Sequence, residues 1–555
     1  MTQDGVLRAA PRFVLALMAL PVAAGIAGTV APVLGSDAIA RLLAWPGLAG
    51  AVRLSVVTGG AATLIALGLT LLIVAALQGG RAFGVITHLL SPLLALPHAA
   101  AALGLAFLIA PSGWIARALS PWATGWTVPP DLLILNDPGG WALVAGLVVK
   151  EVPFLLLMVL AALPQADAAR RMTLSRSLGY GQVAGWMLAV LPGVWPQIRL
   201  PVYAVLAYSM TAVDMALILG PTLPPTLSAQ VVGWMMQPDI ALRGPAAAGA
   251  LLQLALVGGA LALWRIGERL VAGAGMRLAA GGRRGAGLDR AAGPLAAGAA
   301  LLAVGLVAGG MAGLAVWSVA GLWSFPDLLP ESYTLKTWMR AGPGLARAAA
   351  LTLLVAALAT AVALALVLAC LEAEARFGLV PGAGALWLLY LPLIVPQVAF
   401  LPGLQVLALV GGADGTPLAV AAAHLVFVLP YVFLSLSAPW RAWDGRIALA
   451  GAALGATPGR VFWRLRLPML LRPVLTAAAV GLAVSVGQYL PTLLIGGGRV
   501  PTLTTEAVAL ASGGNRRVIG AYAMLQMALP ALGFALALAI PALAFRNRRG
   551  MRAGP

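Results

Sequence analysis

Long apolar runs restrict the folds open to this chain more than any other feature. About twelve stretches of roughly 20 or more mostly apolar residues follow one another, and a helix of that length crosses about 30 Å of hydrocarbon. Hydrophobic residues make up 61% of the chain and charged residues only 9%, too little polar material to cover a soluble globule. We therefore predict an all-α integral membrane protein. The expected spans lie near 13–34, 54–78, 83–110, 141–163, 199–220, 246–264, 294–320, 347–371, 380–410, 417–439, 470–495 and 520–544.

Basic residues mark the expected orientation in the membrane. The formal net charge is +18, but the arginines sit in short loops beside the apolar runs, as the positive-inside rule describes. This pattern indicates membrane topology and not nucleic-acid binding. The arginine-rich loops alternate so that both termini are predicted to be cytoplasmic. The loops of the other side are richer in Pro, Trp and Asp and hold fewer arginines, among them Arg117, Arg243, Arg340, Arg499, Arg516 and Arg517.

The sequence gives little support to metal, redox or enzyme chemistry. Cys370 is the only cysteine, so no disulfide framework can form within the chain. The histidines His88, His98 and His424 form no ligand-spaced cluster. No Ser/His/Asp or paired-carboxylate arrangement occurs at a plausible spacing. We expect no metal, no cofactor and no catalytic site.

Two short motifs recur at one spacing. Leu178-Gly179 leads to Leu191-Pro192, and 276 positions later Leu454-Gly455 leads to Leu467-Pro468. Pro225-Thr226-Leu227 recurs as Pro501-Thr502-Leu503 at the same offset. Farther upstream the offset grows, pairing Thr63 with Thr360 and Pro97 with Pro396, because the first half has a longer outer loop. The chain is therefore predicted to be a tandem duplication.

The duplication predicts the domain organisation. A segment rich in Gly, Ala and Arg, residues 265–293, has no long apolar run and forms the natural boundary. We predict a first six-helix repeat over 1–264, a cytoplasmic basic linker over 265–293, a second six-helix repeat over 294–545 and a basic cytoplasmic tail over 546–555. Because six is even, both repeats enter the membrane in the same sense and are parallel.

The repeated segment falls in an Arg-containing loop between the fourth and fifth spans of each half. The glycine permits a sharp turn, and the Leu-Pro ends the segment just before the next span. Trp186 and Phe462 occupy the same repeat position, where an aromatic side chain could fill a pocket on a partner. An ordinary loop with an interfacial aromatic is the alternative for either segment alone. Their recurrence at one spacing favours a functional role.

At these positions the sequence resembles the permease subunits of ABC importers. Their cytoplasmic coupling loop has the pattern Glu-Ala-Ala, three residues, Gly, nine residues, Ile, one residue, Leu-Pro. Gly179, Leu191 and Pro192 match the Gly and Leu-Pro of this pattern, as do Gly455, Leu467 and Pro468. Thr173-Leu174-Ser175 and Leu449-Ala450-Gly451 stand where Glu-Ala-Ala is expected, and Ala189 and Leu465 replace the Ile. The missing glutamates remove any specific ion pair that they would form with the ATPase.

The resemblance covers nearly the whole chain as a fused pair of permeases, similar to iron(III), thiamine and polyamine-type importers. It implies the type I importer permease fold and a location in the bacterial inner membrane. It also implies two separate cytoplasmic ATPase subunits, which act on the two coupling loops, and an external substrate-binding protein. The residues themselves agree that energy comes from elsewhere. A P-loop needs Gly-Lys-Ser/Thr, and neither lysine of the chain, Lys150 or Lys336, stands in such a motif.

A few polar residues fall inside the expected spans. Lys150 lies about 13 Å along a helix from Trp141, near the bilayer centre, where a charge costs about 2.5–3.5 kcal/mol. Glu151 is adjacent but points about 100° away on a regular helix. Asp214 lies in the fifth span, and Gln488 lies two residues from its repeat equivalent, Leu490.

Two interpretations of these residues remain open. Lys150, Glu151, Asp214 and Gln488 are candidates for the translocation path, and a structural charge network together with drift between the repeats is the alternative. His98 and Gln397 follow the matched prolines and are expected to be packing and kink residues.

Three function classes follow from the sequence. The first is the permease of an ABC importer. The second is a secondary transporter of the major-facilitator type, which also has two parallel six-span halves and a basic central loop. The loop after the second span, Gln78 to Arg81, lacks the Gly and Asp-Arg pattern of that family. The third, a membrane scaffold or enzyme, has no supporting feature. Substrate selectivity is expected to lie largely in the binding protein.

Overall fold

In a computed structural model of the protein, the structure describes residues 3–90, 96–282 and 284–546. The described part is mostly helical and contains no β-strand, apart from one isolated bridge between Ala320 and Tyr333. Nine of its helices are long and apolar enough to span a membrane, and three bent helix pairs bring the total to twelve. The prediction of an all-α membrane fold with about twelve spans is confirmed.

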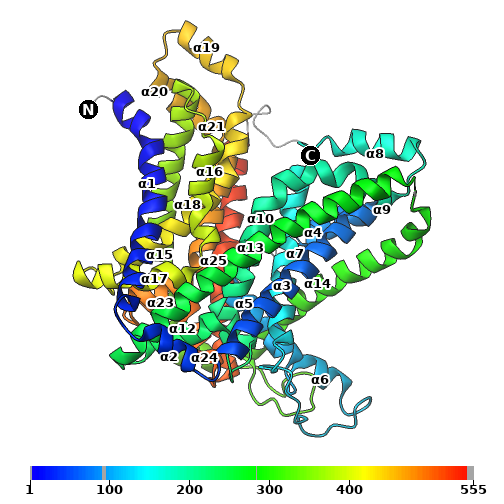
Figure 1. The fold of residues 1–555 in the computed structure, drawn as a ribbon, viewed down its shortest axis with the longest axis vertical. Coiled ribbons are helices and arrows are strands. Elements are labelled where there is room, and N and C mark those ends of the chain that lie inside the picture. Colours follow the sequence, from blue (N-terminus) through cyan, green and yellow to red (C-terminus); the bar gives the residue numbers. More distant parts are fainter. Residues whose placement is uncertain (1–2, 91–95, 283, 547–555) are drawn as a thin grey trace.

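The first half ends in a long helix, α13 (Figure 1). Its helices are α1 (Gln3–Val30), α2 (Ala38–Ala44), α3 (Leu48–Leu77), α4 (Arg81–Leu90), α5 (His98–Ile109), α6 (Trp114–Leu119), α7 (Trp141–Ala162), α8 (Ala168–Ser177), α9 (Gln182–Gly185), α10 (Leu191–Thr211), α11 (Val213–Leu219), α12 (Leu227–Met236) and α13 (Arg243–Ala280). Short 3-10 helices cover Ala31–Val33 and Ile240–Leu242, and a π-helix covers Trp186–Val190.

The second half repeats this order. Its helices are α14 (Asp289–Val319), α15 (Lys336–Phe377), α16 (Ala383–Ile394), α17 (Gln397–Val410), α18 (Pro417–Arg441), α19 (Gly445–Ala453), α20 (Pro458–Val461), α21 (Leu467–Met469), α22 (Leu471–Val486), α23 (Leu490–Gly496), α24 (Leu503–Ala511) and α25 (Arg516–Ala544). A 3-10 helix covers Ala286–Leu288, and a second π-helix covers Phe462–Arg466.

Several span boundaries differ from those expected. The expected span 83–110 is α4 and α5, and residues 91–95 between them lie outside the described part. Its counterpart in the second half, α16 with α17, bends by 86° where Pro396 follows Val395. Proline fixes its own φ and disfavours helical geometry in the residue before it, which accounts for the break.

The segment predicted as a linker is partly helical. α13 is 38 residues long, about 57 Å, so it extends well past the about 30 Å of hydrocarbon. Residues 265–280 belong to this extension, and α14 begins at Asp289. Of the predicted tail 546–555, only Arg546 lies in the described part.

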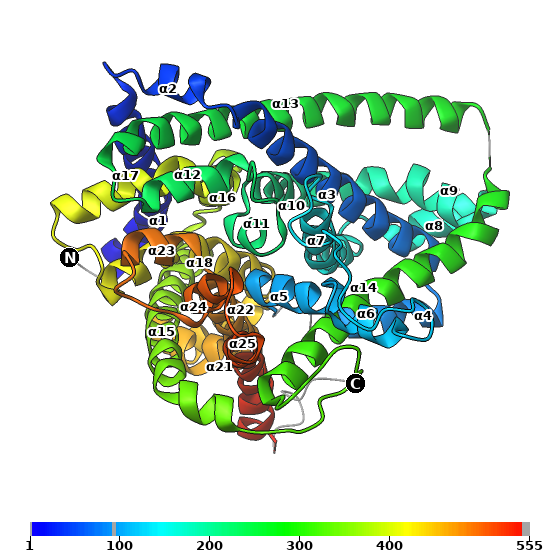
Figure 2. The same cartoon turned by 90° about the horizontal axis from the view of Figure 1, so that it is seen from below.

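The first helix of each half packs on the other half. α1 lies against α15, α16 and α17, and α14 lies against α3 and α5, as the two views show (Figures 1 and 2). Paired glycines allow these close crossings. A Cβ added at Gly403 would lie 1.9 Å from the carbonyl oxygen of Gly25, and one added at Gly310 would lie 2.7 Å from the carbonyl carbon of Gly104. Gly104 and Gly403 follow the matched prolines by the same seven positions.

A repeated hydrogen bond supports the register of the duplication. Ser55 Oγ accepts from the Leu227 amide at 2.9 Å in the first half, and Thr352 Oγ1 accepts from the Leu503 amide at 2.9 Å in the second. Both leucines end the matched Pro-Thr-Leu motif. In both halves, therefore, the same type of hydrogen bond joins the motif to a neighbouring helix, α12 to α3 and α24 to α15.

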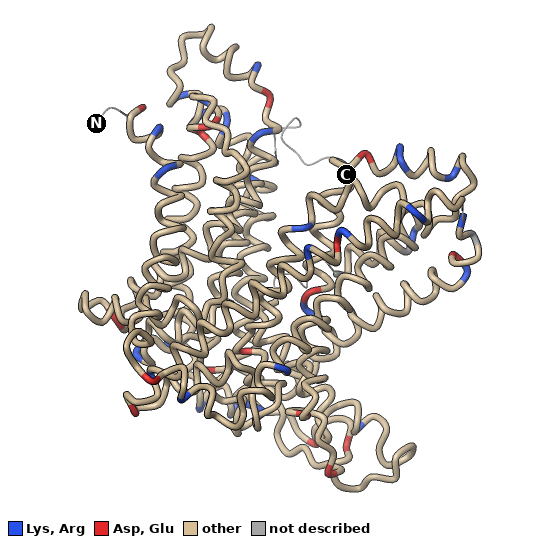
Figure 3. The backbone as a smooth tube through the Cα atoms, in the orientation of Figure 1, with Lys and Arg blue, Asp and Glu red and all other residues tan. Residues whose placement is uncertain are grey.

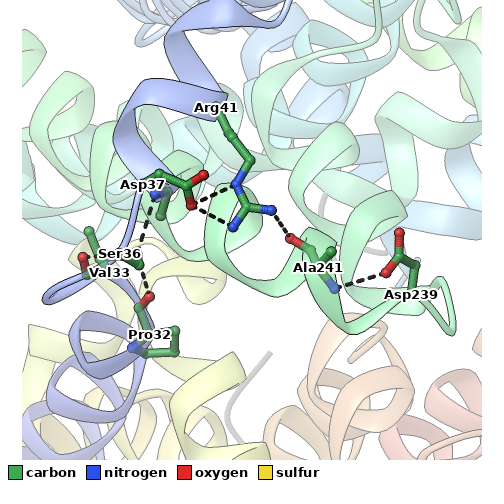
Figure 4. A network of polar contacts seen from close by, with 8 residues as sticks. Pro32, Val33, Ser36, Asp37, Arg41, Asp239 and Ala241 are labelled. Atoms are coloured by element: carbon green, nitrogen blue, oxygen red, sulfur yellow. Dashed lines mark hydrogen bonds and ion pairs between the residues drawn. The ribbon is translucent and has the colours of Figure 1, made fainter.

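The two ends of the molecule differ. Both chain termini, α8 and α19 lie at one end, which we term the loop end (Figure 1). Lys and Arg positions mark α8 and the segment around α19 and α20 (Figure 3). At the opposite end, Arg41 pairs with Asp37 at 2.6 Å and donates to the Ala241 carbonyl at 3.1 Å (Figure 4). This network joins the connection after α1 to the one before α13.

Candidate coupling loops and central polar cluster

The two loops that carry the repeated motif have the same backbone. In each, a short helix ends at a glycine in the left-handed region, with φ of +81° at Gly179 and +77° at Gly455. The next residue, Tyr180 or Ala456, donates its amide to a carbonyl five residues back, at 3.2 and 3.0 Å. Glycine is favoured here because a Cβ strains left-handed geometry. The motif glycine therefore sets the turn in both loops.

A π-helix follows in each loop, at the same repeat position. The Leu191 amide donates to the Trp186 carbonyl five residues before it, and the Leu467 amide donates to that of Phe462. The prolines that follow, Pro192 and Pro468, have no amide hydrogen to donate. The Leu-Pro of the motif thus stands where the widened turn passes into the next span.

Trp186 faces the interior of the chain. Its side chain is fully buried, and its Nε1 donates to Gln78 Oε1 at 2.7 Å. The hypothesis that this aromatic fills a pocket on a partner is wrong for Trp186, because the side chain is already buried within the chain. Phe462 is half-buried, with ring centroids 6.0 Å from Trp440 and 4.9 Å from Trp463.

Leucines, not the motif aromatics, are the exposed apolar side chains at the turns. Leu178 is 63% exposed and Leu454 is 89% exposed, and each stands directly before the left-handed glycine. They are repeat equivalents, 276 positions apart. Sequence reasoning treated them as spacing markers only. Their recurrence in a polar loop was the signal that could have identified them.

The first loop is held by the segment that joins the two halves. Asp289, the first residue of α14, accepts from the amides of Gln182 at 2.7 Å and Val183 at 3.0 Å. This carboxylate caps α9 from more than 100 residues away and favours its positive end. The Gly181 amide also donates to the Arg284 carbonyl at 2.9 Å. The predicted linker is thus part of the first loop's support.

The second loop is held by buried ion pairs. Arg466, in the π-helix, pairs with Glu372 of α15 at 2.6 Å, and Arg376 pairs with the other oxygen of Glu372 at 2.6 Å. The Arg466 guanidinium also lies 4.3 Å from the ring centre of Trp443. At the start of α19, hydrogen bonds from Arg446 lower the pKa of Asp444, whose carboxylate caps the helix. The two halves therefore fix equivalent loops by different chemistry.

Three of the four candidate path residues, Lys150, Glu151 and Asp214, are buried near the start of α5. Lys150 Nζ donates to the Leu96 carbonyl at 2.5 Å, and Glu151 lies 3.5 Å from His98 Nε2. The contact with Glu151 places His98 among polar partners, beyond the packing role expected of it. On the other side, the Tyr208 ring lies 4.6 Å from His98, and its hydroxyl donates to Asp214 at 3.3 Å. We call Lys150, Glu151, His98, Tyr208 and Asp214 the central polar cluster.

Gln488 belongs to the second half and borders this cluster. It lies between α22 and α23, is half-buried, and its carbonyl accepts from Thr492 Oγ1 at 2.9 Å. A Cβ on the neighbouring Gly487 would lie 3.9 Å from Pro97, so this turn faces the start of α5. The second half places a different set nearby, with His424 bonded to Ser485 and Thr492 at 2.8 Å each. The halves therefore meet at this turn, and each carries buried polar groups near it.

Metal binding has no candidate in the described part of the chain. No group of three or more His, Cys, Asp or Glu side chains lies close enough there to hold an ion. Glu151, His98 and Asp214 are linked through Tyr208 rather than gathered around a common centre.

Comparisons with known proteins bear on the family of the chain. No protein-family model matches the sequence. The chain is 32% identical to the inner membrane ABC transporter permease protein YnjC of Escherichia coli (strain K12), over 94% of each protein. It is 35% identical to the molybdenum transport system permease protein ModB of Mycobacterium bovis, over 20% of this chain and 47% of ModB. It is 29% identical to the putrescine transport system permease protein PotI of Escherichia coli (strain K12), over 28% of this chain and 58% of PotI.

These relatives confirm the predicted function class, and none of them favours the major-facilitator alternative. The match to YnjC extends across both halves, as the fused two-permease prediction requires. With nine to twelve candidate spans among its described residues, this chain belongs to the family of ABC transporter permeases, as a multi-pass subunit of the inner membrane.

Proposed function

We propose that the two loops, residues 168–192 and 445–468, are the docking points of two ATPase subunits, and that the loop end faces the cytoplasm. The observation that carries this proposal is the exposed Leu178 and Leu454, each before a left-handed glycine at the same end of the molecule. An exposed leucine in a polar loop is suited to fill an apolar pocket on a partner. Two equivalent leucines suit two copies of one partner.

Movement of a docked loop is carried into the membrane through the contacts already described. In the first half, Trp186 bonded to Gln78 ties the loop to the end of α3, and Asp289 ties it to α14. In the second half, the ion pair between Arg466 and Glu372 ties the loop to α15. Because α14 also packs on α25, a push on the first loop reaches both halves.

The translocation path, in this proposal, passes through the central polar cluster. Lys150, Glu151 and Asp214 are costly to bury. Asp214 lies next to the 49° bend between α10 and α11, and in the second half α22 ends at Val486 before α23 begins at Leu490. Such breaks change shape more readily than regular helices and are suited to a gate. An external binding protein would deliver the substrate to the end opposite the loops. The cargo follows from that partner, and a binding protein encoded beside this chain would identify it.

Replacement of the exposed leucines by aspartate tests the docking role. The full-length chain is purified in detergent from its native host, and its ATPase activity and bound proteins with a Walker sequence are measured. We expect Leu178→Asp and Leu454→Asp each to reduce ATPase recovery about tenfold or more, as loss of an interface anchor does. Leu133→Asp, at a leucine 66% exposed in the loop after α6, is the matched control. Normal ATPase recovery with both loop variants would refute the docking role of the loops.

A further inference from the structure

Arginines at the end opposite the loops run against the charge pattern of the rest of the chain. Most have internal partners. Arg117 donates to the carbonyls of Ser324 and Asp327 at 2.6 and 2.8 Å, and Arg516 donates to Ser112 Oγ at 2.6 Å. Arg499 pairs with Asp414. These arginines are accounted for by the packing of the outer connections.

Arg340 and Arg517 differ from these arginines, because they line the same cavity as Lys336. The cavity has a volume of about 540 Å³ and lies between the first turns of α15 and α25 and the segment from Ala320 to Lys336. Ser332, Thr334, Thr337 and Asn515 add polar groups to its wall, and none of its lining residues is acidic. Within the described residues, the side chains of Lys336 and Arg340 form no ion pair with a carboxylate.

The arrangement is unfavourable without an anion. Lys336 and Arg340 are four residues apart on one helix, a spacing at which like charges repel. Arg517 uses one guanidinium nitrogen to donate to the Gly321 carbonyl, while its buried Nε has no partner in the described part of the structure. An oxyanion with several acceptor oxygens would offset part of the charge of the three cations and bond to the guanidinium groups.

The surroundings point to a lipid as the source of that oxyanion. Leu322, 61% exposed, lines the cavity with Ala341 and Val518, and Met339 beside it is 71% exposed. The cavity also lies at the starts of α15 and α25, two of the candidate membrane spans. A site with charge on one wall and exposed apolar side chains at its edge matches a phosphate headgroup with attached acyl chains.

We propose that this cavity binds the phosphate headgroup of an anionic phospholipid. The bound headgroup joins α15 to α25 at the end opposite the coupling loops. The site is separate from the docking loops and from the central polar cluster, so the proposal does not depend on either of their roles.

The test is a lipid titration of the purified full-length chain in neutral detergent. The thermal unfolding midpoint is followed with dioleoylphosphatidylglycerol, with dioleoylphosphatidylcholine and with inorganic phosphate, and apparent affinities are taken from the shifts. We expect phosphatidylglycerol to stabilise the protein at lower concentration than the other two. Arg340→Gln with Arg517→Gln should weaken this effect about thirtyfold, as loss of two charges near a lipid surface predicts. The control variant, Arg53→Gln with Arg243→Gln, removes two cations at the same end. It should leave the stabilisation by phosphatidylglycerol unchanged.

Three outcomes would overturn the proposal. Equal stabilisation by both lipids would show no headgroup site. Equal effect of inorganic phosphate and phosphatidylglycerol would assign the cavity to a soluble oxyanion instead. An unchanged affinity in the double variant would place the lipid elsewhere. Should that variant fail to fold, Lys336→Gln alone gives the same test, because Lys336 is exposed. The apparent affinity for phosphatidylglycerol is then expected to fall about fivefold.

Discussion

Single residues explain why the two candidate coupling loops share one shape. Gly179 and Gly455 hold the left-handed turn, and Leu178 and Leu454 beside them project from the protein. The motif aromatic has the opposite role in the first loop, since Trp186 is an internal anchor. One short motif thus combines a turn, an exposed contact and a buried anchor within a few positions.

The glycine turn can be tested at Gly455. A Cβ there would meet no atom within 4 Å, so Gly455→Ala causes no clash and acts only through its φ of +77°. Left-handed geometry costs a residue with a Cβ about 1–2 kcal/mol. We expect faster hydrogen exchange across residues 446–461 and weaker ATPase recovery. Gly459→Ala, in the helical α20 and equally free of neighbours, should change neither.

The path assignment can be tested at Asp214. Asp214→Asn keeps the shape of the side chain but removes the charge that accepts from Tyr208. We expect uptake by membrane vesicles, supplied with the cognate binding protein, to fall about tenfold, because charged hydrogen bonds are roughly twice as strong as neutral ones. ATPase recovery should not change, and Asp131→Asn, in an exposed loop, should transport normally. Full uptake by the Asp214 variant would make that residue structural.

Elements far apart in sequence cooperate at each loop. The start of α14 caps α9 in the first half, whereas α15 holds the second loop through Glu372. The 3-10 turn Ala286–Leu288 leads directly into the capping residue Asp289, so the connection between halves also positions a coupling loop. A chain cut at this connection would lose that restraint on the loop.

The cap can be tested by Asp289→Asn. An asparagine keeps one acceptor oxygen but loses the charge at the positive end of α9. Loss of that charge removes about 0.3–1 kcal/mol of stabilisation from the start of the helix. We expect exchange of the Gln182 and Val183 amides to quicken by about two- to fivefold. Arg290→Gln, at the next position on α14, is the control and should leave both amides as they are. Unaltered exchange in the Asp289 variant would contradict the capping role.

At the scale of the whole molecule, the halves are interlocked. α1 crosses the second half and α14 crosses the first, each through paired glycines. The central polar cluster lies near the point where Gly487 of the second half faces Pro97, the residue directly before α5. Neither repeat therefore completes its own packing alone.

The interlock can be tested at Gly403. A Cβ there would lie 1.9 Å from the Gly25 carbonyl oxygen, so Gly403→Val must push α1 away from α17. Overpacking of this kind costs about 1–3 kcal/mol or more. We expect a lower thermal unfolding midpoint in detergent, whereas Gly298→Val, with open space around it, should unfold normally. If Gly403→Val and the unsubstituted chain had equal unfolding midpoints, the crossing of α1 and α17 would accommodate the larger side chain without cost.

The sequence alone determined the class of the fold, the duplication and the position of the loops. These depend on hydrophobic run length and on residue spacing, which are local properties that a span or a turn needs wherever it lies. Gly179, Gly455 and the two Leu-Pro pairs could be chosen on those grounds. The glycines and the Leu-Pro pairs were recognisable although Glu-Ala-Ala is replaced in both loops.

Only the tertiary structure decided which side chains meet. It buried Trp186, exposed Leu178 and Leu454, and brought Asp289 to α9 and His98 to Glu151. It also placed each first helix on the opposite half and gathered Lys336, Arg340 and Arg517 around one cavity. Such contacts depend on how helices bend and cross over long sequence separations. Hydropathy and spacing within a single chain carry no record of those distances.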